Sequence, residues 1–369
     1  MSERLLRLHA ECGQSPWLDN LKRDLISSGE LARLRDDGVR GLTSNPTIFQ
    51  KAIQGSTAYD EQFRSLLASG SSIVDCYWSL VLADIHGALD VFASLHASSG
   101  GGDGFVSVEV DPHLANDTAG TLAAALELWS RVDRPNLMVK IPATRAGLPA
   151  IRAAIAAGVN VNVTLIFGLD RYDAVMEAYI SGLEERLAAG GRLAGIASVA
   201  SFFVSRVDTE IDARLDADGS SPALALRGRA AVAQAQLAYQ NFRRAFSGDR
   251  WDRLASNGAV VQRPLWASTS TKNPAYPDTL YVDRLIGPDS VNTLPDATLL
   301  AFADHGSPVR TVDLDPSAAG GVWSDLARVG VDVDDVAEKL EREGLASFVA
   351  SFDDLLNALR DKATSWGFA

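Results

Sequence analysis

The stretch Leu137-Met138-Val139-Lys140-Ile141-Pro142 is an apolar run interrupted by one lysine. Such a short run is typical of a strand that is buried on both faces of a parallel sheet. The lysine stands out, because only six of the 34 basic residues in the chain are lysines. Desolvation disfavours the charged ammonium and makes the amine a better nucleophile toward carbonyl groups. Lys140 is therefore either a candidate catalytic amine or a strand-end lysine whose ammonium reaches solvent.

Seven further stretches predict strands around this one. They are residues 16–19, 39–44, 105–110, 160–167, 196–203, 260–268 and 279–286. Helical patterns separate them, at residues 21–34, 73–95, 121–132, 148–157, 171–189, 204–215 and 223–246. Eight strands alternating with helices favour a closed α/β architecture, a (β/α)8 TIM barrel with additional helices, over an open sheet. We expect one barrel domain over residues 1–369, with an extra C-terminal helix at about 334–360.

The composition is that of an ordinary globular protein, with 369 residues, 47% hydrophobic and 22% charged. The net charge of −13 disfavours nucleic acid and anionic membranes as partners, so an anionic substrate would need a local positive site. Cys12 and Cys76 are far apart in the sequence, which fits reduced thiols in a cytoplasm. Residues 1–10 lack the apolar region of a signal peptide, and no apolar stretch approaches the roughly 18 residues that span a bilayer.

Polar side chains alternate with apolar ones along the predicted strands. Ser107 and Glu109 share one face of their strand, and Asn162 and Thr164 share one face of theirs. Helices cover the outer face of a parallel barrel, so these polar faces should point inward, toward Lys140. Barrel interiors are normally packed with aliphatic side chains. The polar groups therefore need either mutual hydrogen bonds, as in a purely structural network, or a ligand.

Six motifs occur in a characteristic order and spacing. They are Trp17-Leu18-Asp19-Asn20, Gly41-Leu42-Thr43-Ser44-Asn45-Pro46, Val106-Ser107-Val108-Glu109-Val110, Met138-Val139-Lys140-Ile141-Pro142-Ala143-Thr144, Val161-Asn162-Val163-Thr164-Leu165-Ile166-Phe167 and Ala200-Ser201-Phe202-Phe203-Val204-Ser205-Arg206. Together they resemble transaldolase, in the longer bacterial form. Residues 266–274 and 279–287 extend the resemblance.

The resemblance implies a class I Schiff-base enzyme of the pentose phosphate pathway, a transferase of aldehyde and ketone groups. It would transfer a dihydroxyacetone unit from sedoheptulose 7-phosphate to glyceraldehyde 3-phosphate, giving erythrose 4-phosphate and fructose 6-phosphate. The resemblance implies no cofactor and no metal. The expected partners are sugar-phosphate substrates, without nucleic acid or membrane. A cytoplasmic monomer or homodimer is expected.

The resemblance also implies catalytic roles for four residues. Lys140 would form the Schiff base, and Asp19 would exchange the proton as the carbon–carbon bond breaks and forms. Glu109 would act on the carbinolamine through a water held by Thr164. An iminium is an electron sink, so such cleavage needs a carboxylate that serves as base and then as acid.

The substrate-binding set that the resemblance implies is larger. It comprises Asn45, Asn162, Ser201, Phe203, Arg206, Ser268 and Lys272. The amides and Ser201 would hydrogen-bond donor hydroxyls, and Phe203 would line the pocket. Arg206 and a second cation would hold the phosphate. Lys272 is the candidate for that cation, in a loop after Ser268 that looks longer than in short transaldolases.

Three of these residues also have structural interpretations. Asp19 could be the N-cap of the helix that follows Asn20. Asn45 could cap a helix whose first turn contains Pro46, and this role is compatible with substrate binding. Arg206 could form a surface ion pair with Asp208 or Glu210.

Three other functions compete with a transaldolase. A metal-dependent aldolase would need a cluster of histidines and carboxylates, but the five histidines fall outside the polar strand faces. The second alternative is a fructose-6-phosphate aldolase, which is a lyase. Members of that group resemble this chain but have a shorter barrel, and they use a tyrosine in proton transfer. A non-catalytic sugar-phosphate-binding barrel would not need Lys140, Asp19 and Glu109 together.

Overall fold

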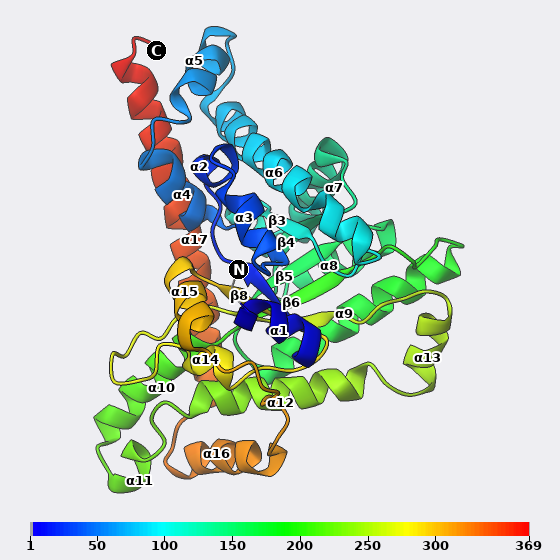
Figure 1. Ribbon diagram of the computed structural model, residues 1–369, viewed down its shortest axis with the longest axis vertical. Helices are drawn as coiled ribbons and strands as arrows, with labels where there is room; N and C mark the ends of the chain where they lie inside the picture. The colour runs from blue at the N-terminus through cyan, green and yellow to red at the C-terminus, as the bar shows by residue number, and fades with distance from the viewer. Residues whose placement is uncertain (1–2, 369) are drawn as a thin grey trace.

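The computed structural model describes residues 3–368, in which eight parallel strands form a closed barrel in chain order (Figure 1). The strands are β1 (Gln14–Leu18), β2 (Gly41–Leu42), β3 (Phe105–Glu109), β4 (Leu137–Pro142), β5 (Val161–Ile166), β6 (Ser198–Phe203), β7 (Arg263–Ala267) and β8 (Ser290–Leu294). This confirms the (β/α)8 barrel. The barrel forms because every strand is buried on both faces, by inward side chains and by the surrounding helices.

Helices follow most of the strands. From the N-terminus they are α1 (Glu3–Cys12), α2 (Arg23–Ser27), α3 (Glu30–Asp36), α4 (Pro46–Gln54), α5 (Asp60–Ala68), α6 (Ile73–Ser98), α7 (Thr118–Val132), α8 (Gly147–Ala157) and α9 (Leu169–Ala188). The later ones are α10 (Ser205–Asp218), α11 (Ser221–Leu224), α12 (Ala230–Ala245), α13 (Asp249–Ser256), α14 (Leu280–Asp283), α15 (Asp296–His305), α16 (Pro316–Arg328) and α17 (Val333–Ser365). A short 3-10 helix, η1 (Pro112–Asn116), follows β3.

The predicted eighth strand at residues 279–286 is wrong. Residues Leu280–Asp283 form α14, and β8 follows at Ser290–Leu294. Tyr281, Val282, Leu285 and Ile286 are all buried, at a spacing that suits a helical turn as well as a short strand. The true strand carries Asn292 and Thr293 and is held by pairing to both β1 and β7, which the local sequence does not reveal.

Helix α6 corrects the expectation about apolar stretches. By length and mean hydropathy it could cross a membrane. Instead it packs on the barrel, with contacts to β3 and to the helices α2, α3, α5 and α17. Its Asp84 is 2% exposed and accepts hydrogen bonds from Arg23 Nε (2.8 Å) and the Tyr59 hydroxyl (2.7 Å). The apolar length of α6 therefore reflects its burial in the core of this protein.

Strand register brings the polar faces together inside the barrel. Glu109 on β3 pairs with Lys140 on β4, which pairs with Asn162 on β5. Side chains of paired residues in a parallel sheet point to the same face, so the three lie side by side. Beyond Asn162 the strand has a bulge at Leu165, whose φ of 59° lies in the left-handed region. Such strain at the carboxyl end of a strand is common next to functional sites.

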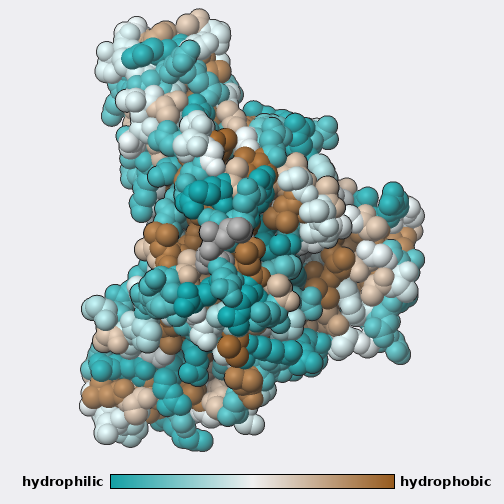
Figure 2. All heavy atoms as spheres, in the orientation of Figure 1, coloured by the Kyte–Doolittle hydropathy of each residue, from teal (hydrophilic) through white to brown (hydrophobic). Residues whose placement is uncertain are grey.

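The C-terminal helix α17 is longer than predicted, and it covers the carboxyl ends of the barrel strands. Asp332 caps its first turn. In Figure 1 it is the long red helix beside α4, and it also contacts η1, α6, α10 and β5. Its packing on loops that follow several strands explains why it lies over the barrel mouth. Figure 2 shows that the viewed face is mostly hydrophilic, with small hydrophobic patches.

Candidate active site

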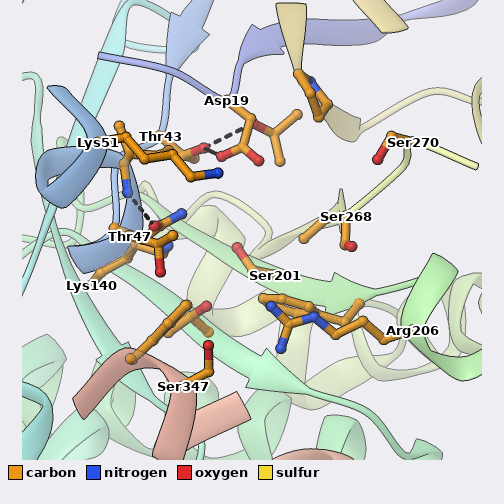
Figure 3. Close-up of a pocket in the computed structure, with 18 of the residues that line it drawn as sticks. Asp19, Thr43, Thr47, Lys51, Lys140, Ser201, Arg206, Ser268, Ser270 and Ser347 are labelled. Atoms are coloured by element: carbon orange, nitrogen blue, oxygen red, sulfur yellow. Dashed lines mark hydrogen bonds between the residues drawn. The ribbon is translucent and has the colours of Figure 1, made fainter. Parts of the chain in front are cut away.

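A cavity of about 340 Å³ opens at the carboxyl ends of the strands (Figure 3). Its lining comprises Asp19, Thr43, Asn45, Thr47, Ile48, Lys51, Lys140, Thr164, Ser201, Phe203, Arg206, Ala267, Ser268, Ser270, Lys272, Thr293, Pro295, Ser347 and Phe348. Nine of the eleven predicted site residues are among them, and Glu109 and Asn162 lie behind the lining. Active sites of this fold lie at this end of the barrel.

Lys140 is at the floor of the cavity and is only 4% exposed. Its Nζ donates a hydrogen bond to the Ser44 carbonyl oxygen (3.1 Å) and lies 3.4 Å from Glu109 Oε2. The ring centroid of Phe348, from α17, is 6.0 Å from the same nitrogen. The interpretation of Lys140 as a solvent-reaching lysine is therefore wrong. The Lys140 amine faces the cavity but is almost completely shielded from solvent.

Burial raises the pKa of the Glu109 carboxyl to about 7, although the neighbouring Lys140 ammonium opposes the shift. Both Glu109 carboxyl oxygens and Thr164 Oγ1 are buried without a hydrogen-bond partner among residues 3–368. Buried polar atoms normally have partners, so these two side chains have bonding capacity left for a ligand or a water.

Asp19 follows β1, and its carboxyl is held by Thr43, which also contacts Thr293. Thr43 Oγ1 donates to Asp19 Oδ1 (2.9 Å) and is 2.8 Å from Thr293 Oγ1. The first of these bonds is dashed in Figure 3. Burial raises the pKa of the Asp19 carboxyl, while Lys140 and Thr43 lower it. The N-cap interpretation is wrong, because the N-cap of α2 is Lys22. The Asp19 carboxyl faces the cavity instead.

The three predicted hydroxyl-binding residues have different surroundings. Asn45 caps α4, where its Oδ1 accepts a hydrogen bond from the Ile48 N–H (3.0 Å). Asn45 also lines the cavity, so its position fits both the helix cap and a contact with substrate. Asn162 is fully buried, donates to Ser107 Oγ (3.0 Å) and accepts from Ser201 Oγ (2.7 Å). Part of the polar interior is therefore a structural network that supports the floor of the pocket.

Besides Lys140, three basic side chains line the cavity: Arg206 from the first turn of α10, Lys272 from the loop after β7, and Lys51 from α4. Burial lowers the pKa of Arg206, whereas the carboxylates of Asp19 and Glu343 raise it. Burial is the main cause that lowers the pKa of Lys272, and the positive charge of Arg206 lowers it further. A site with so much unneutralised positive charge suits an anionic ligand.

The alternative ion pairs for Arg206 are wrong. Asp208 accepts from the Ala231 N–H and the Tyr281 hydroxyl, and Glu210 pairs with Arg214 and Lys339. Within residues 3–368 the Arg206 guanidinium forms no ion pair, and it lies 5.3 Å from the Phe203 ring centroid. Figure 3 shows Arg206 and Ser268 among the side chains that line the cavity.

The structure adds cavity residues that the sequence motifs did not identify. They are Thr43, Thr47, Ile48, Lys51, Ala267, Ser270, Thr293, Pro295, Ser347 and Phe348. A signal existed for Lys51, which lies on one helical face with Thr47 and Ile48 just after the Asn45 cap. No local signal marks Ser347 and Phe348, since they reach the site only because α17 folds over the barrel mouth. Residues 3–368 hold no group of three or more His, Cys, Asp or Glu side chains that could bind a metal ion.

The fold and the site together define a barrel enzyme with a buried lysine under an open, polar and cationic pocket. Residues 16–359 match the family described as Transaldolase/Fructose-6-phosphate aldolase, and the chain belongs to that family. The transaldolase of Parafrankia sp. (strain EAN1pec) is 52% identical over 367 residues, 99% of each chain. Transaldolase 1 of Streptomyces coelicolor is 52% identical over 361 residues, 97% of this chain and 94% of the relative. The transaldolase of Mycolicibacterium smegmatis is 51% identical over 348 residues, 94% of each.

Proposed function

We propose that this protein is a transaldolase that moves a dihydroxyacetone unit from sedoheptulose 7-phosphate to glyceraldehyde 3-phosphate through a Schiff base on Lys140. The observation that carries the proposal is the contact of the buried Lys140 amine with Glu109, 3.4 Å apart, beneath a cavity lined by Asp19 and Arg206. A neutral amine in that position can attack a ketose carbonyl, and a protonated imine can then accept electrons.

The covalent steps need only groups of this chain. Lys140 Nζ adds to C2 of the donor, and loss of water from the carbinolamine gives an iminium. Asp19 takes the proton of the C4 hydroxyl, the C3–C4 bond breaks, and its electron pair moves into an enamine as the aldose product leaves. The enamine then attacks the acceptor aldehyde, whose oxygen receives the proton from Asp19. Hydrolysis of the new iminium releases the ketose product and regenerates the free lysine.

Glu109 and Thr164 have the position and free bonding capacity to manage water in the first and last steps. A carboxyl whose pKa is raised to about 7 can both accept and donate a proton near neutral pH. The unpartnered oxygens of both side chains could be satisfied by one bridging water. We assign to that water the proton transfers of carbinolamine formation and breakdown.

The cationic wall fits the phosphate of both substrates. Arg206 is free of ion pairs within residues 3–368, and Ser268 and Lys272 line the same cavity. A guanidinium offers two parallel hydrogen bonds to phosphate oxygens, and a lysine adds a point charge. Asn45, Ser201 and Phe203 would contact the sugar between the phosphate and Lys140.

We infer the setting of the enzyme from the same set of features. The reaction belongs to the pentose phosphate pathway, and the enzyme would work in the cytoplasm as a monomer or homodimer without metal or cofactor. The net charge of −13 disfavours nucleic acid and anionic membranes as partners, and the basic residues of the cavity supply the local positive site that a small anionic substrate needs.

A donor–acceptor exchange assay tests the function. Incubation with fructose 6-phosphate and erythrose 4-phosphate should form sedoheptulose 7-phosphate, and omission of the acceptor should suppress turnover. Steady release of dihydroxyacetone from fructose 6-phosphate alone would instead identify the lyase alternative within the family. Absence of both reactions, with binding retained, would identify a sugar-phosphate-binding barrel.

A further inference from the structure

The loop after β7 carries Lys272 and forms few hydrogen bonds to the rest of the described chain. Among the described residues, the hydrogen bonds of segment 270–276 join its own members, as in Lys272 Nζ to Ser270 Oγ (2.6 Å) and the Tyr276 N–H to the Asn273 carbonyl. The exception is the Tyr276 hydroxyl, which donates to Asp212 Oδ2 (2.6 Å). Asp212 belongs to α10, the helix whose first turn contains Arg206.

The Asp212 carboxylate is itself held rigidly. It is 9% exposed, and its Oδ1 accepts the Gly228 N–H (2.9 Å) just before α12. Gly228 has a φ of 68°, and a Cβ on it would lie 2.7 Å from Cζ of the Tyr276 ring. A larger residue at position 228 would therefore clash with the Tyr276 ring in the place from which its hydroxyl reaches the carboxylate.

A second hydrogen bond of the same kind lies one helical turn earlier on α10. Asp208 is 1% exposed and accepts from the Tyr281 hydroxyl (2.8 Å) and from the Ala231 N–H (2.7 Å). Residues four apart lie on one helix face, so α10 presents two carboxylates to the segment that leads from β7 into α14. Tyr281 fixes the far end of that segment, and Tyr276 fixes the part nearest to Lys272.

An anchor matters here because Lys272 and Arg206 have the same charge. The two cations repel each other in the empty site, and the charge of Arg206 is a cause of the lowered pKa of Lys272. A loop without an anchor would relax to separate them, and substrate binding would have to reverse that movement. A hydrogen bond from a tyrosine to an ionised carboxylate is short and strong enough to oppose such a shift.

We propose that the Tyr276–Asp212 hydrogen bond is a positioning device for the phosphate site: it holds the β7 loop against α10, so that Lys272 stays beside Arg206. Tyr276 does not line the cavity and acts only through Lys272. The inference rests on the proposed function for the nature of the ligand, a sugar phosphate. In this proposal Tyr276 affects the affinity for phosphate although it does not contact the phosphate.

The test is a double-mutant cycle with Tyr276→Phe and Lys272→Met. Tyr276→Phe should raise KM for fructose 6-phosphate about fivefold, as for one charge-assisted contact weakened, and should change kcat by less than about twofold. KM for unphosphorylated fructose should not change. In the Lys272→Met background the same substitution should have no further effect, because the group it positions is gone. Tyr179→Phe is the matched control, since its hydroxyl bonds the Val260 carbonyl before β7 (2.7 Å).

Two outcomes overturn the inference. One is that Tyr276→Phe raises KM equally with Lys272 and with Met at position 272. The other is an equal rise in KM for phosphorylated and unphosphorylated donors.

Binding of inorganic phosphate separates this inference from the proposed function. It is measured by calorimetry on the wild type, the two single variants and the double variant of the cycle. If the wild-type chain turns over no sugar phosphate, yet Tyr276→Phe weakens phosphate binding only when Lys272 is present, the function is wrong and the positioning role stands. If turnover is normal and Tyr276→Phe changes neither KM nor phosphate binding, only the positioning role fails.

Discussion

Glu109 Oε2 lies 3.4 Å from Lys140 Nζ across the neighbouring strands β3 and β4, and both side chains are almost completely buried. The register of the two strands pairs these residues directly. Loss of solvent destabilises the ionised carboxyl and raises the pKa of Glu109 to about 7, so that its proton is exchangeable near neutral pH. The first three predictions below test this buried pair and Asp19, which lines the same cavity as Lys140.

The pH dependence of imine formation should report Glu109. Ionised Glu109 is the form that accepts a proton, and its fraction increases as pH rises through about 7. We therefore expect the single-turnover rate of imine formation to rise about tenfold per pH unit below that value and to level off above it. Stopped-flow or rapid borohydride quenching at pH 5.5 to 8.5 would measure this. In Glu109→Gln the inflection should vanish and the rate should fall on the order of 10²-fold, whereas an unchanged inflection would assign it to another group.

Lys140 should carry the covalent intermediate. Borohydride added with fructose 6-phosphate should inactivate the enzyme and add a reduced three-carbon unit to the peptide that contains Lys140. Lys140→Met should abolish labelling and turnover, because Lys140 is the cavity amine that lies next to Glu109. Mass spectrometry of the digested protein locates the adduct. Lys272→Met is the control and should still be labelled at position 140; an adduct at Lys272 or Lys51 would refute the assignment.

Asp19→Asn should separate imine formation from carbon–carbon cleavage. The amide keeps the size of the side chain and an acceptor for Thr43, but it cannot take the C4 hydroxyl proton. We expect the imine to form at close to the normal rate and kcat to fall on the order of 10²- to 10⁴-fold. Rapid-quench borohydride trapping compared with steady-state turnover shows the stalled step. The roles of the two carboxylates would be reversed if Asp19→Asn failed to form the imine while Glu109→Gln formed it normally.

Arg206→Ala should act mainly on binding of the phosphate. The guanidinium has no ion pair within residues 3–368, so its removal leaves no carboxylate unpaired. KM for fructose 6-phosphate should rise on the order of 10- to 100-fold with a smaller loss of kcat, since remote binding energy also helps to orient the substrate. The comparison is with unphosphorylated fructose, for which kcat/KM should change little. Equal losses for both donors would show that Arg206 does not bind the phosphate.

The pair of buried Asp84 and half-buried Arg23 should contribute to stability. Asp84→Ala leaves Arg23 and the Tyr59 hydroxyl without their shared acceptor. Because Arg23 is 20% exposed, the loss should be about 2 kcal/mol, which is less than for a fully buried pair. The midpoint of urea unfolding should therefore fall clearly. The matched control is Asp90→Ala on the same helix, an exposed residue 3.8 Å from Arg134, which should change stability by less than about 0.5 kcal/mol. Similar effects of both substitutions would contradict this view.

The strand alternation and the motif order were sufficient to predict the barrel and most of the pocket floor. The positions of Glu109, Lys140 and Thr164 could be predicted because the side-chain direction along a strand has a period of two, which is a local property of the backbone. Their convergence follows from one global assumption, that helices cover the outer face of a parallel barrel. Asn45 could be predicted as a helix cap because Pro46 follows it, and as a site residue because of the transaldolase resemblance.

Tertiary structure alone decided the part of the site that the C-terminal helix contributes. Ser347 and Phe348 enter the site because α17 packs against α4 over the strand ends, and nothing in their local sequence states which helix face meets the cavity. Residues 279–286 became a helical turn, and β8 formed from a more polar segment, because closure of the barrel supplies strand partners on both sides. The link from Tyr276 to Asp212 likewise joins segments far apart in the chain. Local patterns encode side-chain direction and burial, whereas long-range contacts depend on how whole elements dock, and that is settled only when the complete core is packed.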